Sequence, residues 1–211
     1  MDLGGGPLPF NRVSRSPHLL VARFSPDGAL RWAHGLVPRE GAARARVGGL
    51  TVDTQGNAWL GGTSAGFTLG AQPLPEGPFV ARLSPRGAVE RVRGFTGEGT
   101  LAMQALAADG ADGVVLVGDF SGHRDFGDGV REATGRGAFA VRLGPDGATR
   151  WSRAWSSSAE GLVSARAVAV DVFGAVHVAG AYAGAVGFGG PAFVTVRQRA
   201  PFVLKLSADG A

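Results

Sequence analysis

Short apolar runs that end in a turn recur along this chain at one spacing. Four nine-residue segments align without gaps, and each passes from an apolar run with a single cation into a turn closed by glycine: 20–28, 79–87, 139–147 and 202–210. The closing glycines are 59, 60 and 63 residues apart. Self-similarity at a fixed period of this length is the signature of a tandem-repeat fold. The pattern therefore predicts successive copies of one unit of about sixty residues.

A second and a third landmark recur in the same order. Asp53 to Gly62, Asp109 to Gly118 and Asp171 to Gly180 each span nine positions, with a short apolar run on both sides of a turn. The third landmark is looser and appears as Asp2-Leu3-Gly4, Thr68-Leu69-Gly70, Asp125-Phe126-Gly127 and Gly187-Phe188-Gly189. Three landmarks in one order indicate that the copies share one structure.

Each unit reads as four short strands, because apolar runs of this length bounded by turn residues suit buried strands. The first strands are expected near 47–53, 103–109 and 165–171, and the second near 57–62, 113–119 and 175–181. The third are expected near 19–24, 79–84, 138–143 and 201–206, and the fourth near 29–34, 88–93 and 148–154. Helical periodicity is missing, and 36 glycines with 12 prolines suit many turns. The sequence predicts an all-β protein.

Four-stranded units in tandem are typical of a β-propeller, since one blade cannot bury both faces of its sheet without neighbours. The prediction is a single domain, 1–211, holding a partial propeller of about 3.5 blades. The blade parts are 1–35, 47–94, 102–154 and 164–211. A β-helix or β-solenoid is the alternative architecture, although such repeats are shorter and lack paired tight hairpins.

The pattern resembles a bacterial β-propeller repeat family, of the seven-bladed type common in GC-rich bacteria such as myxobacteria. The residues that carry the resemblance are Asp125-Phe126-Gly127, Phe79-Val80-Ala81-Arg82-Leu83, Trp32, Trp151 and Val52-Asp53-Thr54-Gln55-Gly56-Asn57. Arg91 departs from it, since it stands where Trp32 and Trp151 stand in their units. The resemblance implies a secreted or envelope-associated interaction protein without catalytic residues. The sequence itself leaves the compartment open.

Charge and composition limit the classes of partner and site that the sequence predicts. The net charge is +4, and Lys205 is the sole lysine among 21 basic residues. The arginines are spread along the chain with acids between them, which does not favour a nucleic-acid partner. No apolar run is long enough to predict a transmembrane segment, and the first residues lack the pattern of a secretion signal. Cysteine is absent, so neither disulfides nor thiolate metal sites are expected.

Candidate chemistry is sparse, and neither a cofactor nor a metal is predicted. None of His18, His34, His123 and His177 has a second ligand at the spacing that zinc sites use. The recurrent Asp53, Asp109 and Asp171 are expected to cap turn amides. A cation recurs at one position of the third strand, as Arg23, Arg82, Arg142 and Lys205. These four either line a ring-shaped anion site or, the favoured interpretation, lie at blade edges or between blades with their charged ends in water.

The longer connections, about 35–46, 63–78, 120–137 and 182–200, are expected to share one face. Long loops on a rigid scaffold commonly bind ligands. The predicted binding residues on this face are Arg39, Arg44, Arg46, His123, Arg124, Asp128 and Arg197. The opposite face, made of tight hairpins with Arg86 and Asp146, is expected to be inert.

The leading hypothesis is a non-enzymatic binding or scaffold propeller that contacts a protein or a polysaccharide through the long-loop face. The alternatives are a propeller lectin and a carbohydrate-active enzyme, a glycoside hydrolase or lyase, for which Asp128 and Glu132 are the candidate carboxylates. A partial ring would leave apolar faces uncovered. We therefore expect either a homodimer that completes the ring or a longer parent chain with further blades.

Overall fold

Every regular element in the described part of the chain is a β-strand. The computed structural model describes residues 19–39, 44–110, 113–158 and 161–211, without the side chains at 196 and 197. It contains no helix in these ranges, and its antiparallel sheets do not close on themselves. The predicted all-β class is confirmed.

The strands form sheets mostly in chain order, except that β5 and β6 join the first sheet from between two strands of the second. The first sheet has the order β1 (Leu19–Phe24), β2 (Leu30–Pro38), β5 (Phe67–Leu69) and β6 (Gln72–Pro73). The second has the order β3 (Ala45–Val52), β4 (Ala58–Ser64), β7 (Gly77–Leu83) and β8 (Val89–Gly94).

The remaining seven strands divide into two parts, which we call the third and the fourth sheet. The third holds β9 (Leu101–Ala108), β10 (Val114–Asp125), β11 (Val130–Leu143) and β12 (Thr149–Trp155). The fourth holds β13 (Leu162–Val170), β14 (Val176–Val186) and β15 (Phe193–Leu206). One parallel residue pair, Arg136 with Leu162, joins the two. The second and third sheets have the same strand order. All thirteen predicted strands are present, and β10, β11, β14 and β15 are longer than predicted.

Tight hairpins join β1 to β2, β7 to β8 and β11 to β12, the third strand to the fourth in the first three sheets. In the second sheet, the amide of Ser84 donates to Ala88 O (2.8 Å) and the amide of Gly87 donates to Ser84 O (2.9 Å). Gly87 has a φ of +86°, which a residue with a Cβ adopts only at a cost. The turn chemistry of these segments therefore fixes the register of the hairpins.

The recurrent aspartates cap the hairpins between first and second strands. Asp53 Oδ1 accepts the amides of Gln55 (3.1 Å) and Asn57 (2.8 Å). Asp109 Oδ1 accepts the amide of Gly113 at 2.8 Å, and Asp171 Oδ1 accepts that of Ala175 at 2.9 Å. The predicted capping role is confirmed.

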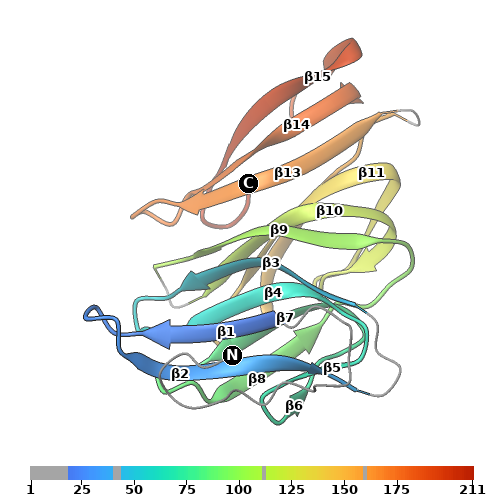
Figure 1. Ribbon diagram of the computed structural model, residues 1–211. Coiled ribbons are helices and arrows are strands. Elements are labelled where there is room, and N and C mark those ends of the chain that lie inside the picture. Colours follow the sequence, from blue (N-terminus) through green and yellow to red (C-terminus); the bar gives the residue numbers. More distant parts are fainter. Residues whose placement is uncertain (1–18, 40–43, 111–112, 159–160) are drawn as a thin grey trace.

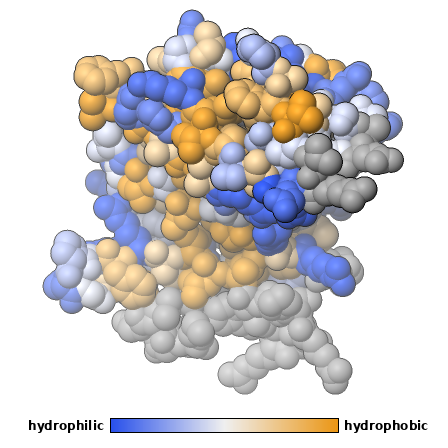
Figure 2. All heavy atoms as spheres, turned by 90° about the horizontal axis from the view of Figure 1, so that it is seen from above, coloured by the Kyte–Doolittle hydropathy of each residue, from blue (hydrophilic) through white to orange (hydrophobic). Residues whose placement is uncertain are grey.

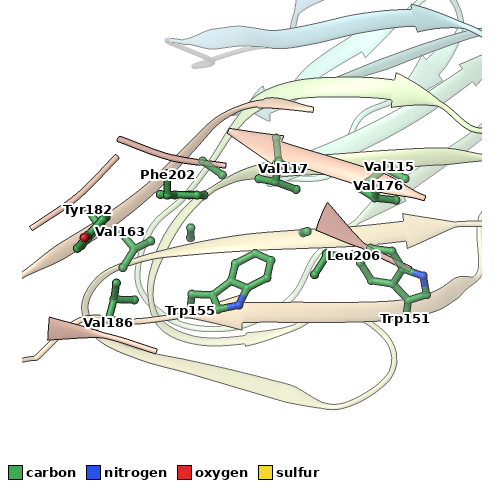
Figure 3. Close-up of a cluster of buried hydrophobic side chains, with 14 residues drawn as sticks. Val115, Val117, Trp151, Trp155, Val163, Val176, Tyr182, Val186, Phe202 and Leu206 are labelled. Carbon is green, nitrogen blue, oxygen red and sulfur yellow. The ribbon is translucent and has the colours of Figure 1, made fainter. Parts of the chain in front are cut away.

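The sheets pack face to face in chain order, with the first strands β3, β9 and β13 one above the other (Figure 1). Apolar clusters fill each junction. Between the third and fourth sheets, Val115 and Val117 face Val176 and Phe202, and all four are buried (Figure 3). The first strands approach closely because β3 carries glycines: a Cβ on Gly49 would lie 2.6 Å from Cδ1 of Leu106 in β9.

Most of the predicted long loops are strands instead. β10 and β11 continue to Asp125 and Val130 as a projecting hairpin, and β14 and β15 do the same. The hairpin of the third sheet binds the connection that precedes it, since the amide of Glu98 donates to His123 O and the amide of Asp125 to Thr96 O. The expectation of long loops was wrong here because these backbone groups find partners in the neighbouring connection.

Candidate binding grooves at the hairpin end

A tryptophan and an arginine join the first sheet to the second. The indole Nε1 of Trp32 donates to Pro85 O at 3.1 Å. Arg23 Nη1 donates to the same oxygen at 3.0 Å and to Gly56 O at 3.3 Å. Both donors are on the first sheet and both acceptors are in hairpin turns of the second, so two side chains fix the position of those turns.

The junction between the third and fourth sheets has the same construction. Trp151 Nε1 donates to Ala208 O at 2.9 Å. Arg142 Nη1 donates to Ala208 O at 2.8 Å and to Gly174 O at 3.3 Å. The Arg142 guanidinium also pairs with Asp109, Nε to Oδ2, at 2.8 Å. Arg23 and Arg142 lie between neighbouring units, which confirms that part of the prediction. The Arg142 side chain is only 12% exposed, so the expectation that its charged end stays in water was wrong.

The middle junction uses arginine in place of tryptophan. Arg91 stands at the tryptophan position, and Arg93, two residues on, donates to Gly147 O (2.5 Å) and Phe126 O (2.7 Å). Burial lowers the pKa of Arg93 from its usual value. Arg82 does not extend to the next sheet as Arg23 does.

Arg82 and Lys205 pair with acids of their own sheets. Arg82 lies 3.7 Å from Asp53 and 3.3 Å from Glu90, and Lys205 lies 3.8 Å from Asp171. The four third-strand cations are therefore engaged with carboxylates or turn carbonyls, and nothing in these contacts supports the ring-shaped anion site.

The two tryptophan junctions each enclose a groove at the end of the sheets where the tight hairpins lie. The first groove has a volume of about 510 Å³ and is lined by Arg23, Phe24, Ser25, Pro26, Arg31, Trp32, Pro85 and Arg86. The second has a volume of about 680 Å³ and is lined by Asp109, Arg142, Gly144, Pro145, Arg150, Trp151, Ala208 and Asp209. Seven positions of the repeat line both grooves, so one site occurs twice.

The two grooves differ in charge. Three arginines and no acid line the first groove, whereas two arginines and two aspartates line the second. Arg31 and Arg86 are exposed, and neither has a hydrogen-bond or ion-pair partner among the described residues. In the second groove, Arg150 pairs with Asp146 at 3.1 Å. The first groove is therefore the stronger candidate for an anionic ligand.

The residues predicted from sequence to bind a ligand lie at the opposite end of the sheets. Arg39, Arg44 and Arg46 are exposed there, as expected. His123 is also exposed, and its Nε2 lies 3.2 Å from Oε1 of Glu132. No groove among those described here gathers these four basic residues.

Two further predicted residues, Arg124 and Asp128, make structural contacts within the protein. Arg124 is only 4% exposed, because it donates to Phe95 O and Gly99 O at 3.2 Å each and anchors the connection before β9. Burial lowers its pKa. Asp128 accepts the amide (2.7 Å) and the hydroxyl (2.6 Å) of Ser152, which attaches the tip of the hairpin to β12. The side chain of Arg197 lies outside the described residues.

Comparisons with known proteins do not assign a family. No family model matches the chain, and no curated protein matches it. In the described ranges no helix could span a membrane, and no three potential ligands lie together as a metal site would require.

Proposed function

We propose that this chain is a non-enzymatic binding module built from β-propeller blades, and that it binds an acidic polysaccharide. The face-to-face packing of successive sheets, with β3 beside β9 and β9 beside β13, supports the propeller, because four-stranded blades pack in this way around a central channel. The shared strand order of the second and third sheets supports it as well.

The first groove carries the binding proposal. Trp32 is partly exposed and lines the groove together with Pro26 and Pro85, and these apolar surfaces suit the hydrocarbon face of a sugar ring. Arg31 from the first sheet and Arg86 from a turn of the second both line the groove, and their guanidinium groups offer donors for carboxylate or sulfate groups. An open groove shared by two sheets accommodates a chain that continues beyond one sugar.

Catalysis is not part of this proposal. Glycoside cleavage needs two carboxyl groups placed across the scissile bond. Asp128 is held by Ser152 and by Arg131 (3.1 Å), and Glu132 is paired with His123. Asp128 therefore has a structural role at the projecting hairpin, whereas Glu132 is an exposed acid in a surface pair.

Binding to polygalacturonate, alginate and neutral dextran tests the proposal, measured by isothermal titration calorimetry at two salt concentrations. We expect binding to the two acidic polymers alone, weakened by salt because exposed charges are screened. The double variant R31A/R86A should lose at least tenfold in affinity. The matched control R44A/R46A removes the same charge from the opposite end and should bind as the unmodified chain does.

Two results would overturn the proposal. One is equal binding of dextran and the acidic polymers, and the other is loss of binding in R44A/R46A with R31A/R86A unaffected. The second result would instead favour the face that carries His123.

A further inference from the structure

One position of the third strand shows which sheet face is covered. Val21, Val80, Ala140 and Val203 occupy this position in the four sheets. The first three are 6%, 2% and 0% exposed, because each packs against the following sheet. Val203, on the outer face of the fourth sheet, is 75% exposed.

The residues that cover this face also recur. The second sheet covers the first with Phe79, Ala81 and Leu83, and the third covers the second with Phe139, Val141 and Leu143. All six are at most 1% exposed.

The corresponding row on the first sheet is Leu20, Ala22 and Phe24. It is half-buried at Leu20 and Ala22, and Phe24 is 47% exposed. Among the described residues, nothing packs against this row of the first sheet as the preceding sheet does in the other units. At the other end of the stack, the outer face of the fourth sheet presents Val203, the kind of residue that such a row covers in the internal junctions.

The outer face of the fourth sheet is apolar beyond Val203. Ala167, Ala179 and Val203 are register partners across the three strands, and Pro201 lies two residues from Val203 on the same side. Figure 2 looks down on the top of the stack and shows apolar residues gathered between hydrophilic ones. Lys205 takes the position in the fourth sheet that Arg142 takes in the third. Its side chain is 65% exposed, whereas that of Arg142, which contacts the next sheet, is 12% exposed.

We propose that the outer face of the fourth sheet binds the outer face of the first sheet of a second copy of this chain. The contact would repeat the chemistry of the internal junctions: Val203 against the row Leu20, Ala22 and Phe24, and Lys205 near the carbonyl of Pro26, the counterpart of Pro85 and Ala208. The two surfaces differ, so the contact is head-to-tail, and two copies close it by forming it twice. This inference is independent of the proposed ligand.

Light scattering after size exclusion tests the contact across a concentration series. The unmodified 21.4 kDa chain should have twice its mass at tens of micromolar. V203D should be a folded monomer that still unfolds cooperatively, because an aspartate at an exposed position disturbs the association and not the core. Its unfolding temperature should not depend on protein concentration, whereas that of the dimeric unmodified chain should rise with concentration. V130D is the matched control: Val130 is 58% exposed at the tip of the projecting hairpin, so this variant should remain dimeric.

Cross-linking identifies the two faces, since the chain has no cysteine. Mixing V203C with A22C under oxidising conditions should yield mainly the mixed disulfide dimer. A monomeric unmodified chain, dissociation of V130D together with V203D, or mainly like-with-like disulfides would each overturn the proposal.

Discussion

The indole of Trp32 lies directly on Gly87 of the following sheet. A Cβ built on Gly87 would be 2.7 Å from Cγ of the indole, and the glycine has a φ of +86°. We predict that G87A lowers the free energy of unfolding by about 3 kcal/mol, from backbone strain together with displacement of the indole. Urea unfolding followed by tryptophan fluorescence measures the loss.

Gly147 provides the control, because it occupies the same turn position one sheet further on. Its φ is +75°, but a Cβ there would meet only Cδ of Arg91, at an ordinary 3.7 Å. G147A should therefore cost only the backbone term, about 1 to 2 kcal/mol. Equal losses for G87A and G147A would show that the indole contact contributes nothing.

The third-strand cations should differ in their contribution to stability. Arg142 pairs with the 3% exposed side chain of Asp109, and R142M should cost about 3 kcal/mol because the buried carboxylate loses its guanidinium. Lys205 lies 3.8 Å from the more exposed Asp171, and K205M should cost less than about 1 kcal/mol. Chemical denaturation of both variants at neutral pH gives the comparison, and a larger loss for K205M would contradict it.

Asp171 should make stability depend on acid pH. The amide of Ala175 lowers the pKa of Asp171, and His177, the amide of Phe173 and Lys205 act in the same direction. The folded pKa is therefore below the unfolded value of about 3.9, and the stabilisation is present above that value and lost as pH falls through the folded pKa. The stability difference between the unmodified chain and D171N should shrink from pH 7 to pH 3. A difference that stays constant over this range would exclude the effect.

Arg91 tests whether the three junctions are interchangeable. It stands at the position of Trp32 and Trp151, above Gly147 of the next sheet. R91W should raise the free energy of unfolding by about 1 kcal/mol, because an indole buries apolar area that the arginine leaves exposed. Thermal denaturation of both variants measures the effect. R150W, at an exposed arginine of the second groove, should give no such gain.

The strands and tight turns could be predicted because their determinants are local. The turn at Gly87 and the capping by Asp53 depend on residues within a few positions of each other, and both were predicted from the repeat. The projecting hairpin of β10 and β11 could not be predicted in this way. Its glycines and charges resemble a loop, and its hydrogen-bond partners, such as Thr96, lie in a connection more than twenty residues away.

The candidate site was missed for the same reason. Arg31 and Trp32 meet Arg86 only because two sheets pack together, and no single segment contains all three. The usable signal was the arginine–tryptophan pair recurring at Arg150 and Trp151. At the opposite end of the sheets, His123 and Arg124 both looked like surface residues in the sequence. Successive side chains of a strand point to opposite faces, so His123 is exposed and Arg124 is buried.

The pairing of β5 with β2 has a consequence for the order in which the chain folds. Most strands pair with their neighbours in sequence, so a sheet can form soon after its own residues leave the ribosome. The edge of the first sheet differs, because Leu36 of β2 pairs with Leu69 of β5. In the sequence, β5 lies between β4 and β7 of the second sheet. Synthesis must therefore proceed well into the second sheet before the first is finished, and the two mature as one cooperative unit.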